Sequence, residues 1–187
     1  PLVGLNRSIV AEGVACLGSN PGVAALAVKR GVEEPYTAGK CGFQIGPCLN
    51  AGGRIGDAKM SAALLMSDDP EEVEAAAARL SHLNDERKRI ERLALREASD
   101  MIEAGACGEN VAVIHHPAWH PGIVGLVASR IKERFDVSAV VVGAGGKGSG
   151  RAVEGFDLGG AVIDAAAEGI LERGGGHKVA AGLTVKP

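Results

Sequence analysis

Aromatic residues and paired cysteines are what this sequence has least of. Trp, Tyr and Phe together make up 3% of its 187 residues, so alanine and aliphatic side chains must build the core. No apolar run reaches the length of about 18 residues that a membrane span needs, and no signal peptide is recognisable. No Cys-X-X-Cys pair occurs and the spacings fit no zinc site, so we expect reduced thiols in a cytoplasmic protein. The four cysteines are Cys16, Cys41, Cys48 and Cys107.

Strong charge and clustered acids are also missing. With 20 basic and 23 acidic residues the net charge is −3, which excludes a polybasic protein but still permits a local phosphate site. The aspartates form neither an Asp-X-Asp nor an Asp-His-His motif, so we expect no metal ion on this chain's own residues. Lys147 lacks the spacing of a P-loop, and no serine or cysteine stands beside a base as a nucleophile would.

Glycine is what the chain has in excess. The 28 glycines are roughly double the usual share of about 7%, and they follow no Gly-X-Y period. They indicate tight turns and places where another backbone or a ligand comes close. The chain begins at Pro1 with sequence that already has a structured pattern, so we expect a piece of a longer protein.

Helix signals dominate the first half. Asn20-Pro21 predicts a short helix over 21–30, and an apolar pattern predicts another over 58–66. The Gly- and Pro-rich segment 31–57 is typical of loops and turns. Asp69-Pro70-Glu71-Glu72 predicts the start of a helix that runs to about 104 and stops at Gly105. At about 1.5 Å per residue it would be about 50 Å long, which favours a connector between two lobes over one arm of a coiled coil.

Strands and helices alternate in the second half. A sheet with some parallel pairing and helices packed on it is the expected arrangement. The predicted strands are 111–115, 137–142, 149–154 and 179–185, and the predicted helices are 122–135 and a segment from Asp157 to Arg173 that stops at Gly174.

Three glycine-framed clusters are candidate phosphate sites: Asn50–Arg54, Lys147–Arg151 and Gly174–His177. Each joins bare backbone to a cation or an imidazole, and a guanidinium fork matches phosphate oxygens. Simpler interpretations stay open: a surface salt bridge for Arg54, a hairpin turn for the second cluster, and a helix end with a turn for the third. A further group, His115, His116 and His120, has no carboxylate nearby; we expect a strand end and, at His120, a hydrogen-bond donor at a helix start.

Taken in order, these clusters resemble the RecJ family of single-strand-specific 5′→3′ DNA exonucleases in the DHH superfamily. The resemblance covers nearly the whole chain. It is carried by six collinear motifs: PLVGLNR (1–7), GFQIGPCLNAGGRIGDA (42–58), LNDERKRIE (83–91), WHPGIVGLVASRIKERF (119–135), GKGSGRAVEGFDLGGAV (146–162) and GGGHKVAAGLTV (174–185).

The resemblance implies an α/β fold in which a long connector helix precedes a DHH-associated domain with a mixed sheet flanked by helices. It assigns 1–67 to the tail of a DHH catalytic lobe, 68–105 to the connector and 106–187 to the DHH-associated domain. The Ser-Gly-Arg motif would contact phosphates, the Gly-Gly-His motif would hold the scissile phosphate, and the first cluster would line the substrate path. We therefore expect a catalytic His177 and substrate binding by Asn50, Arg54, Ser149, Gly150, Arg151, Gly175 and Gly176.

The family's activity implies partners and cofactors. The parent would hydrolyse single-stranded DNA with two Mn²⁺ or Mg²⁺ ions held by the DHH lobe, which is mostly missing from this chain, and would work with DNA repair proteins. We expect this chain alone to bind no metal, contact no membrane and be inactive. Three positions depart from the family: Cys48 replaces an arginine, Ala152 a serine and Glu154 a proline. Two alternatives stay open, a nucleic-acid-binding DHH-associated module and a small-oligonucleotide phosphodiesterase of the same superfamily.

Overall fold

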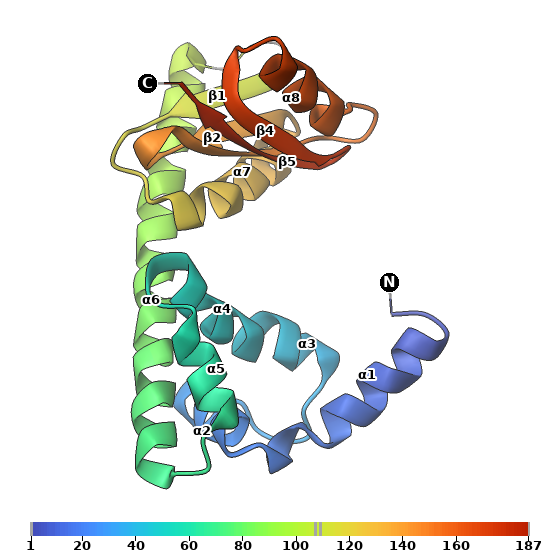
Figure 1. Cartoon of the computed structure of the whole chain (residues 1–187), viewed down its shortest axis with the longest axis vertical. Coiled ribbons are helices and arrows are strands. Elements are labelled where there is room, and N and C mark those ends of the chain that lie inside the picture. Colours follow the sequence, from blue (N-terminus) through green and yellow to red (C-terminus); the bar gives the residue numbers. More distant parts are fainter. Residues whose placement is uncertain (1, 107, 109, 187) are drawn as a thin grey trace. The chain divides into compact units, whose positions relative to one another are not determined.

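The computed structural model describes residues 2–106, 108 and 110–186, with the side chain of residue 106 left aside, so the predicted free thiol at Cys107 lies outside the described residues. The chain divides into two compact units, Pro1–Lys88 and Arg89–Pro187. The predicted three-part division at residues 67 and 105 stays a prediction. Figure 1 labels the α-helices and most of the strands of both units.

The described residues of the first unit form helices joined by loops, with no strand. Asn20 caps α2 by accepting a hydrogen bond from the Val23 amide at 3.0 Å, and Gly31 ends that helix in the left-handed conformation, which confirms the helix predicted over 21–30. The elements are α1 (Leu5–Ala15), η1 (Leu17–Ser19), α2 (Pro21–Arg30), α3 (Ala38–Lys40), η2 (Cys41–Ile45), α4 (Gly46–Ile55), α5 (Lys59–Met66) and the first part of α6 (Pro70–Met101).

The prediction of loops over 31–57 is confirmed at 31–37 and 56–57 but wrong over 38–55, which is helical. Pro47 occupies the first turn of α4, where proline is tolerated. Gly52 lies where a Cβ would be 2.7 Å from the Asp57 carbonyl oxygen, so this glycine permits close packing rather than a turn. Buried packing of α4 through Cys48 and Ala51 therefore outweighs the weak helix propensity of the segment.

The long helix α6 begins as its sequence predicts. Asp69 Oδ1 accepts hydrogen bonds from the amides of Glu71 at 2.8 Å and Glu72 at 3.3 Å. The helix continues as a π-helical turn, η3 (Ile102–Ala106), in which Gly105 has a φ of 97°. Within the first unit, α6 buries Leu80 against Leu26 and Leu64.

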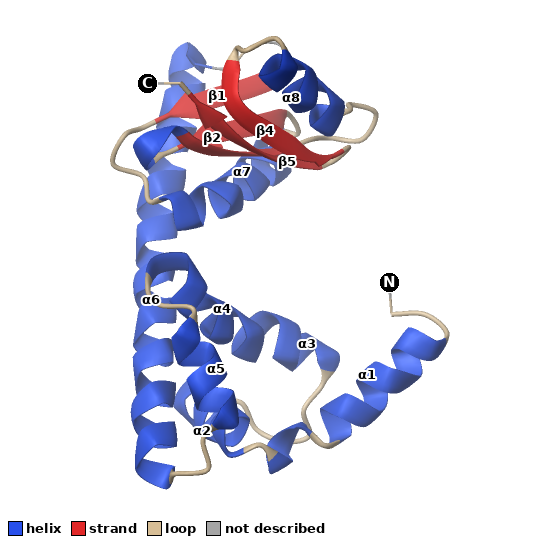
Figure 2. Ribbon diagram, in the orientation of Figure 1, coloured by secondary structure: helices blue, strands red, loops and turns tan. Residues whose placement is uncertain are grey.

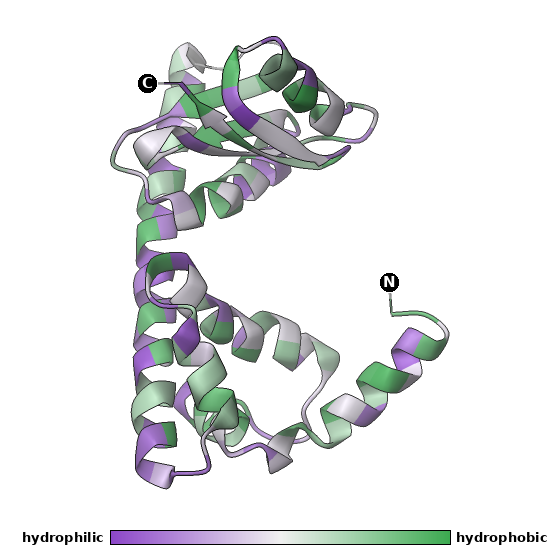
Figure 3. Cartoon of the chain, in the orientation of Figure 1, coloured by the Kyte–Doolittle hydropathy of each residue, from purple (hydrophilic) through white to green (hydrophobic). Residues whose placement is uncertain are grey.

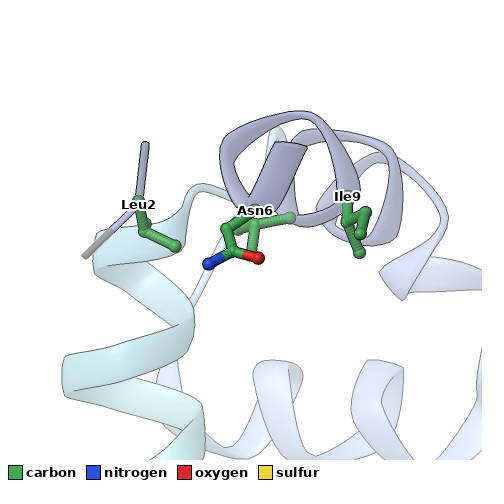
Figure 4. A pocket seen from close by; sticks show the side chains of 4 residues that line it. Leu2, Asn6 and Ile9 are labelled. Carbon is green, nitrogen blue, oxygen red and sulfur yellow. The ribbon is translucent and has the colours of Figure 1, made fainter. Parts of the chain in front are cut away.

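Figure 3 colours the ribbon by the hydropathy of each residue, and hydrophobic and hydrophilic residues alternate along the helices. Among the described residues no single helix is long and apolar enough to cross a membrane, although the bent pair Leu5–Ser19 and Pro21–Arg30 together have sufficient length and composition. Helix α1 has no buried residue, and Leu2, Asn6, Ile9 and Val10 line a hollow of about 390 Å³ beside it (Figure 4).

The second unit is a mixed sheet with a helix on each face, which confirms the predicted fold class. The strands run in the order β1-β2-β3-β5-β4; β1 and β2 are parallel and the other neighbours are antiparallel. Helix α7 packs on β2 and β3, whereas α8 packs on β4 and β5 from the opposite side (Figure 2). The elements are β1 (Val111–His115), α7 (Pro121–Phe135), β2 (Ser138–Val142), η4 (Ala144–Gly146), β3 (Lys147–Arg151), α8 (Leu158–Ala167), β4 (Leu171–His177) and β5 (Ala180–Val185).

The helix predicted to run from Asp157 to Arg173 is too long. Asp157 does cap α8, accepting from the Gly160 amide at 2.9 Å, but the helix ends at Ala167 and Gly169 takes a φ of 75°. Gly174, predicted as the helix stop, lies inside β4 instead. A Cβ on Gly174 would lie 2.6 Å from Val162 Cγ1, so glycine at this position lets β4 pack closely against α8.

Candidate nucleic-acid interface

Strand register brings the second and third glycine-framed clusters onto one face of the sheet. Ser149 of β3 pairs with Gly182 of β5, and Gly182 pairs in turn with Gly175 of β4. Two residues along, Arg151 is aligned through Ala180 with His177. Because paired residues point their side chains to the same face, Ser149, Arg151 and His177 share a face with the bare backbone of Gly175.

Hydrogen bonds fix the Arg151 guanidinium beside Ser149. Arg151 Nη1 donates to Ser149 Oγ at 3.0 Å and to the Gly150 carbonyl oxygen at 2.8 Å. Ser149 Oγ in turn donates to the Ala181 carbonyl oxygen at 3.4 Å. Both side chains are half-buried, so the guanidinium and the hydroxyl are oriented before any ligand arrives.

Gly125 in the middle of α7 makes room for this pair. A Cβ at Gly125 would lie 3.0 Å from Ser149 Oγ and 3.3 Å from Arg151 Nη2. Sequence reasoning did not select Gly125, although an isolated glycine inside an amphipathic helix is a signal of close packing or function.

The three glycines before His177 have different surroundings. A Cβ on Gly174 or Gly176 would collide with protein atoms, whereas a Cβ on Gly175 would meet nothing within 4 Å. His177 is exposed, and its backbone is held by α8, since a Cβ on Gly159 would lie 2.8 Å from the His177 carbonyl carbon. Gly175 and His177 are therefore the members of this motif that face the open side, and neither the predicted turn nor a helix end describes the motif.

Gly150 and Gly176, both predicted to bind substrate, have packing roles on the α8 side. A Cβ on Gly150 would lie 2.6 Å from Leu158 Cδ2, and one on Gly176 would lie 2.8 Å from Ala181 Cβ. Their binding roles stay predictions. The hairpin turn considered for 147–151 is wrong, because this segment is strand β3.

Asn50 and Arg54 belong to the first unit, where both lie on α4. Their spacing of four residues places them on the same face of that helix. Asn50 is exposed and Arg54 is half-buried with interactions of its own. The structure thus brings the first cluster together within α4, and brings the other two together within the second unit.

The residues that depart from the family pattern fall in two kinds of place. Cys48 is fully buried and its Sγ donates to the Gln44 carbonyl oxygen at 3.4 Å. Burial raises the pKa of the Cys48 thiol, against a smaller opposite effect of the Arg30 charge, so the thiol is neutral. Ala152 packs in the core around Leu158, whereas Glu154 is exposed.

No set of metal ligands gathers in the part of the chain that the structure describes: no group of three or more His, Cys, Asp or Glu residues is placed to hold an ion. His115 ends β1, as predicted. His120 caps α7, but its Nδ1 accepts from the Gly122 amide at 3.0 Å, so the predicted donor role is wrong. His116 Nδ1 likewise accepts from the Ala118 amide at 3.2 Å, and its ring lies 5.4 Å from the Trp119 ring.

Comparison with known proteins identifies the family. A DHHA1 domain matches residues 108–187. The chain is 34% identical over 200 residues to the single-stranded-DNA-specific exonuclease RecJ of Escherichia coli K12, covering 100% of this chain and 35% of that protein. It is 39% identical over 150 residues to the Bacillus subtilis 168 protein of the same name, covering 78% of this chain and 19% of that protein. The chain thus spans about a third or less of these relatives.

Solved structures agree. Crystal structures of RecJ from Thermus thermophilus in complex with Mg²⁺ and with Mn²⁺ each match with a TM-score of 0.87 and 34% identity. The match covers 100% of this chain and 29% or 28% of those chains. The resemblance first carried by the sequence motifs is confirmed: the chain carries a DHHA1 domain and is homologous over its full length to one part of the RecJ proteins.

Proposed function

We propose that this chain supplies the substrate-binding face of a single-stranded-DNA-specific 5′→3′ exonuclease. The observation that carries the proposal is the shared sheet face of Ser149, Arg151, Gly175 and His177. The Escherichia coli relative, named as a single-stranded-DNA-specific exonuclease, matches the chain's full length with 34% identity, which supports the same substrate class.

Each residue on this face has a chemical task in binding phosphate. The Arg151 guanidinium presents paired N–H donors to phosphate oxygens, and its bonds to Ser149 Oγ and the Gly150 carbonyl hold it in place. The Ser149 hydroxyl has one proton, which can turn from the Ala181 carbonyl oxygen to a bound phosphate. Gly175 lets the phosphate approach the strand closely, and His177 donates to a phosphoryl oxygen from the end of β4.

We propose that the whole protein hydrolyses phosphodiester bonds with two divalent metal ions. The Mg²⁺ and Mn²⁺ complexes of the Thermus protein support divalent metals for the family. The residues described here do not fit a metal, so the ions would be held by a DHH lobe beyond this chain. This chain alone is then inactive, and adding Mn²⁺ to it should release no nucleotides from single-stranded DNA. Release that persists through repurification would contradict this.

Asn50 and Arg54 have a place in the same proposal. Their common face on α4 gives an amide and a guanidinium that together recognise a nucleotide's phosphate or sugar. Replacing Asn50 and Arg54 by alanine should weaken DNA binding, although Ser149 and Arg151 are unchanged in that variant.

Fluorescence anisotropy with a 5′-phosphorylated single-stranded 20-mer at low salt tests the proposal. The double substitution Arg151→Ala/His177→Ala should lower affinity by at least about tenfold and flatten the salt dependence. The matched control is Arg79→Ala/His82→Ala, which removes the same side-chain types from exposed positions of α6. Equal binding by both double variants would refute the assignment of this face.

A further inference from the structure

A second row of residues with cationic side chains crosses the same sheet face, two residues along the strands from the row through Ser149. Arg173 of β4 pairs with Thr184 of β5, and Thr184 pairs with Lys147 of β3. Lys147 Nζ donates to Thr184 Oγ1 at 3.1 Å, which draws the ammonium over the strand beside it. Arg173 is 81% exposed, and the sole acid recorded beside its side chain among the described residues is Glu172, 4.0 Å from Arg173 Nε.

The sheet fixes the distance between the place where the Arg151 guanidinium is held and the place where the Lys147 ammonium is held. The Arg151 guanidinium is held at Ser149, whereas the Lys147 ammonium is held at its own cross-strand neighbour, Thr184. Ser149 and Lys147 are two residues apart on β3, which corresponds to about 7 Å. The bonds that join successive phosphates in a nucleotide strand span a distance of that order, so one phosphate at each row satisfies both rows.

The row through Ser149 continues into a pair of glycines that the protein itself does not require. A Cβ on Gly175 or on Gly182 would meet nothing within 4 Å, and neither residue adopts the left-handed conformation. Glycine inside a strand lowers stability, and its retention there is typical of a site where a ligand comes close to the backbone. The Gly175–Gly182 pair, called the floor below, therefore exposes backbone without side chains. The Arg151 guanidinium lies at one end of its row, and Lys147 and Arg173 lie in the next row.

We propose that Lys147 and Arg173 form a second phosphate subsite, and that the DNA backbone reaches it from Ser149 and Arg151 across the Gly175–Gly182 floor. This deepens the proposed function and rests on it. The ligand is the neighbouring phosphate of the same single strand. Thr184 positions the Lys147 ammonium, and Arg173 supplies a guanidinium from the outer strand of the sheet.

Charge substitutions test the subsite. In anisotropy titrations with a dT 20-mer, Lys147→Ala and Arg173→Ala should each weaken binding several-fold and reduce the salt slope by about 0.7 to 1. The control Lys186→Ala removes the same charge from the end of the sheet, where the Lys186 ammonium lies 3.7 Å from the Cβ position of Gly169. Lys186→Ala should leave the affinity and the salt slope unchanged.

Gly182→Val tests the floor. Valine favours strands and its Cβ has open space here, so the melting temperature should hold or rise. The added side chain occupies the path of the DNA backbone, so affinity should fall by at least about tenfold. Wild-type affinity in this variant would contradict the claim that the DNA backbone crosses the Gly175–Gly182 pair.

The outcomes separate this inference from the proposal beneath it. Binding that depends on Arg151 but is indifferent to Lys147, Arg173 and Gly182 would overturn the second subsite and leave the proposed function standing. Wild-type protein that does not bind the 20-mer, or binds it independently of Arg151, would overturn both.

Discussion

Alanine at Gly174 and at Gly175 should have opposite effects on stability, although the two residues are adjacent and identical. A Cβ on Gly174 would lie 2.7 Å from the Val162 carbonyl oxygen and 2.6 Å from Val162 Cγ1, and a backbone atom of α8 cannot move away alone. Overpacking of this kind costs about 1–3 kcal/mol. A Cβ on Gly175 meets nothing within 4 Å, and replacing a strand glycine by alanine gains about 0.5–1 kcal/mol.

Urea unfolding of the two single variants, followed by circular dichroism, measures the difference. We expect the variants to differ by roughly 1.5–4 kcal/mol in unfolding free energy, the sum of the two effects. Gly175→Ala should at the same time weaken binding of single-stranded DNA. Equal destabilisation by both substitutions, or a harmless Gly174→Ala, would refute the alternation of faces along β4 from which the binding face is built.

Three further predictions concern other parts of the chain. Asp69→Ala removes the acceptor of the Glu71 and Glu72 amides at the start of α6 and should cost about 1 kcal/mol of unfolding free energy; an unchanged denaturation midpoint would contradict the cap. Trp119→Phe removes the 2.7 Å bond from Nε1 to Glu97 Oε2 and should cost about 0.5–1.5 kcal/mol, because Glu97 is exposed and water can replace the lost donor; the reference is Trp119→Phe/Glu97→Leu, which removes both partners. Burial raises the pKa of the Cys48 thiol, so the unfolded chain loses this proton at lower pH than the native one; stability should fall as pH rises above the ordinary thiol pKa, and Cys48→Ala should flatten that fall in pH-dependent unfolding.

Local signals in the sequence were sufficient at the starts of α2 and α6, where one capping residue controls the boundary. Asn20 and Asp69 cap their helices as predicted, and the apolar runs near 111–115 and 137–142 form the edge strand β1 and the buried strand β2 beside it. The prediction of loops over 31–57 fails at 38–55 because glycine and proline there do not mark turns: Pro47 stands in the first turn of α4, and Gly52 lets that helix pack against the Asp57 backbone. Such packing is a tertiary effect that composition does not reveal.

The candidate site shows the same limit. Motifs selected Ser149, Arg151 and His177, but sequence alone does not determine that β3 and β4 align through β5, because β4 was predicted as the end of a helix. Once the register is known, Gly182, Lys147 and Arg173 follow as members of the same face. Gly125 follows in the same way, since its role depends on where α7 crosses β3.

An NMR titration of the isotope-labelled chain with a 5′-phosphorylated dT oligonucleotide tests most directly that this sheet face binds the strand. The account predicts that the largest amide shifts occur at residues 147–151, 175–177 and 180–184, and that amides of α8 such as Val162 shift little. Shifts centred on α8, or spread evenly over both units, would contradict the account.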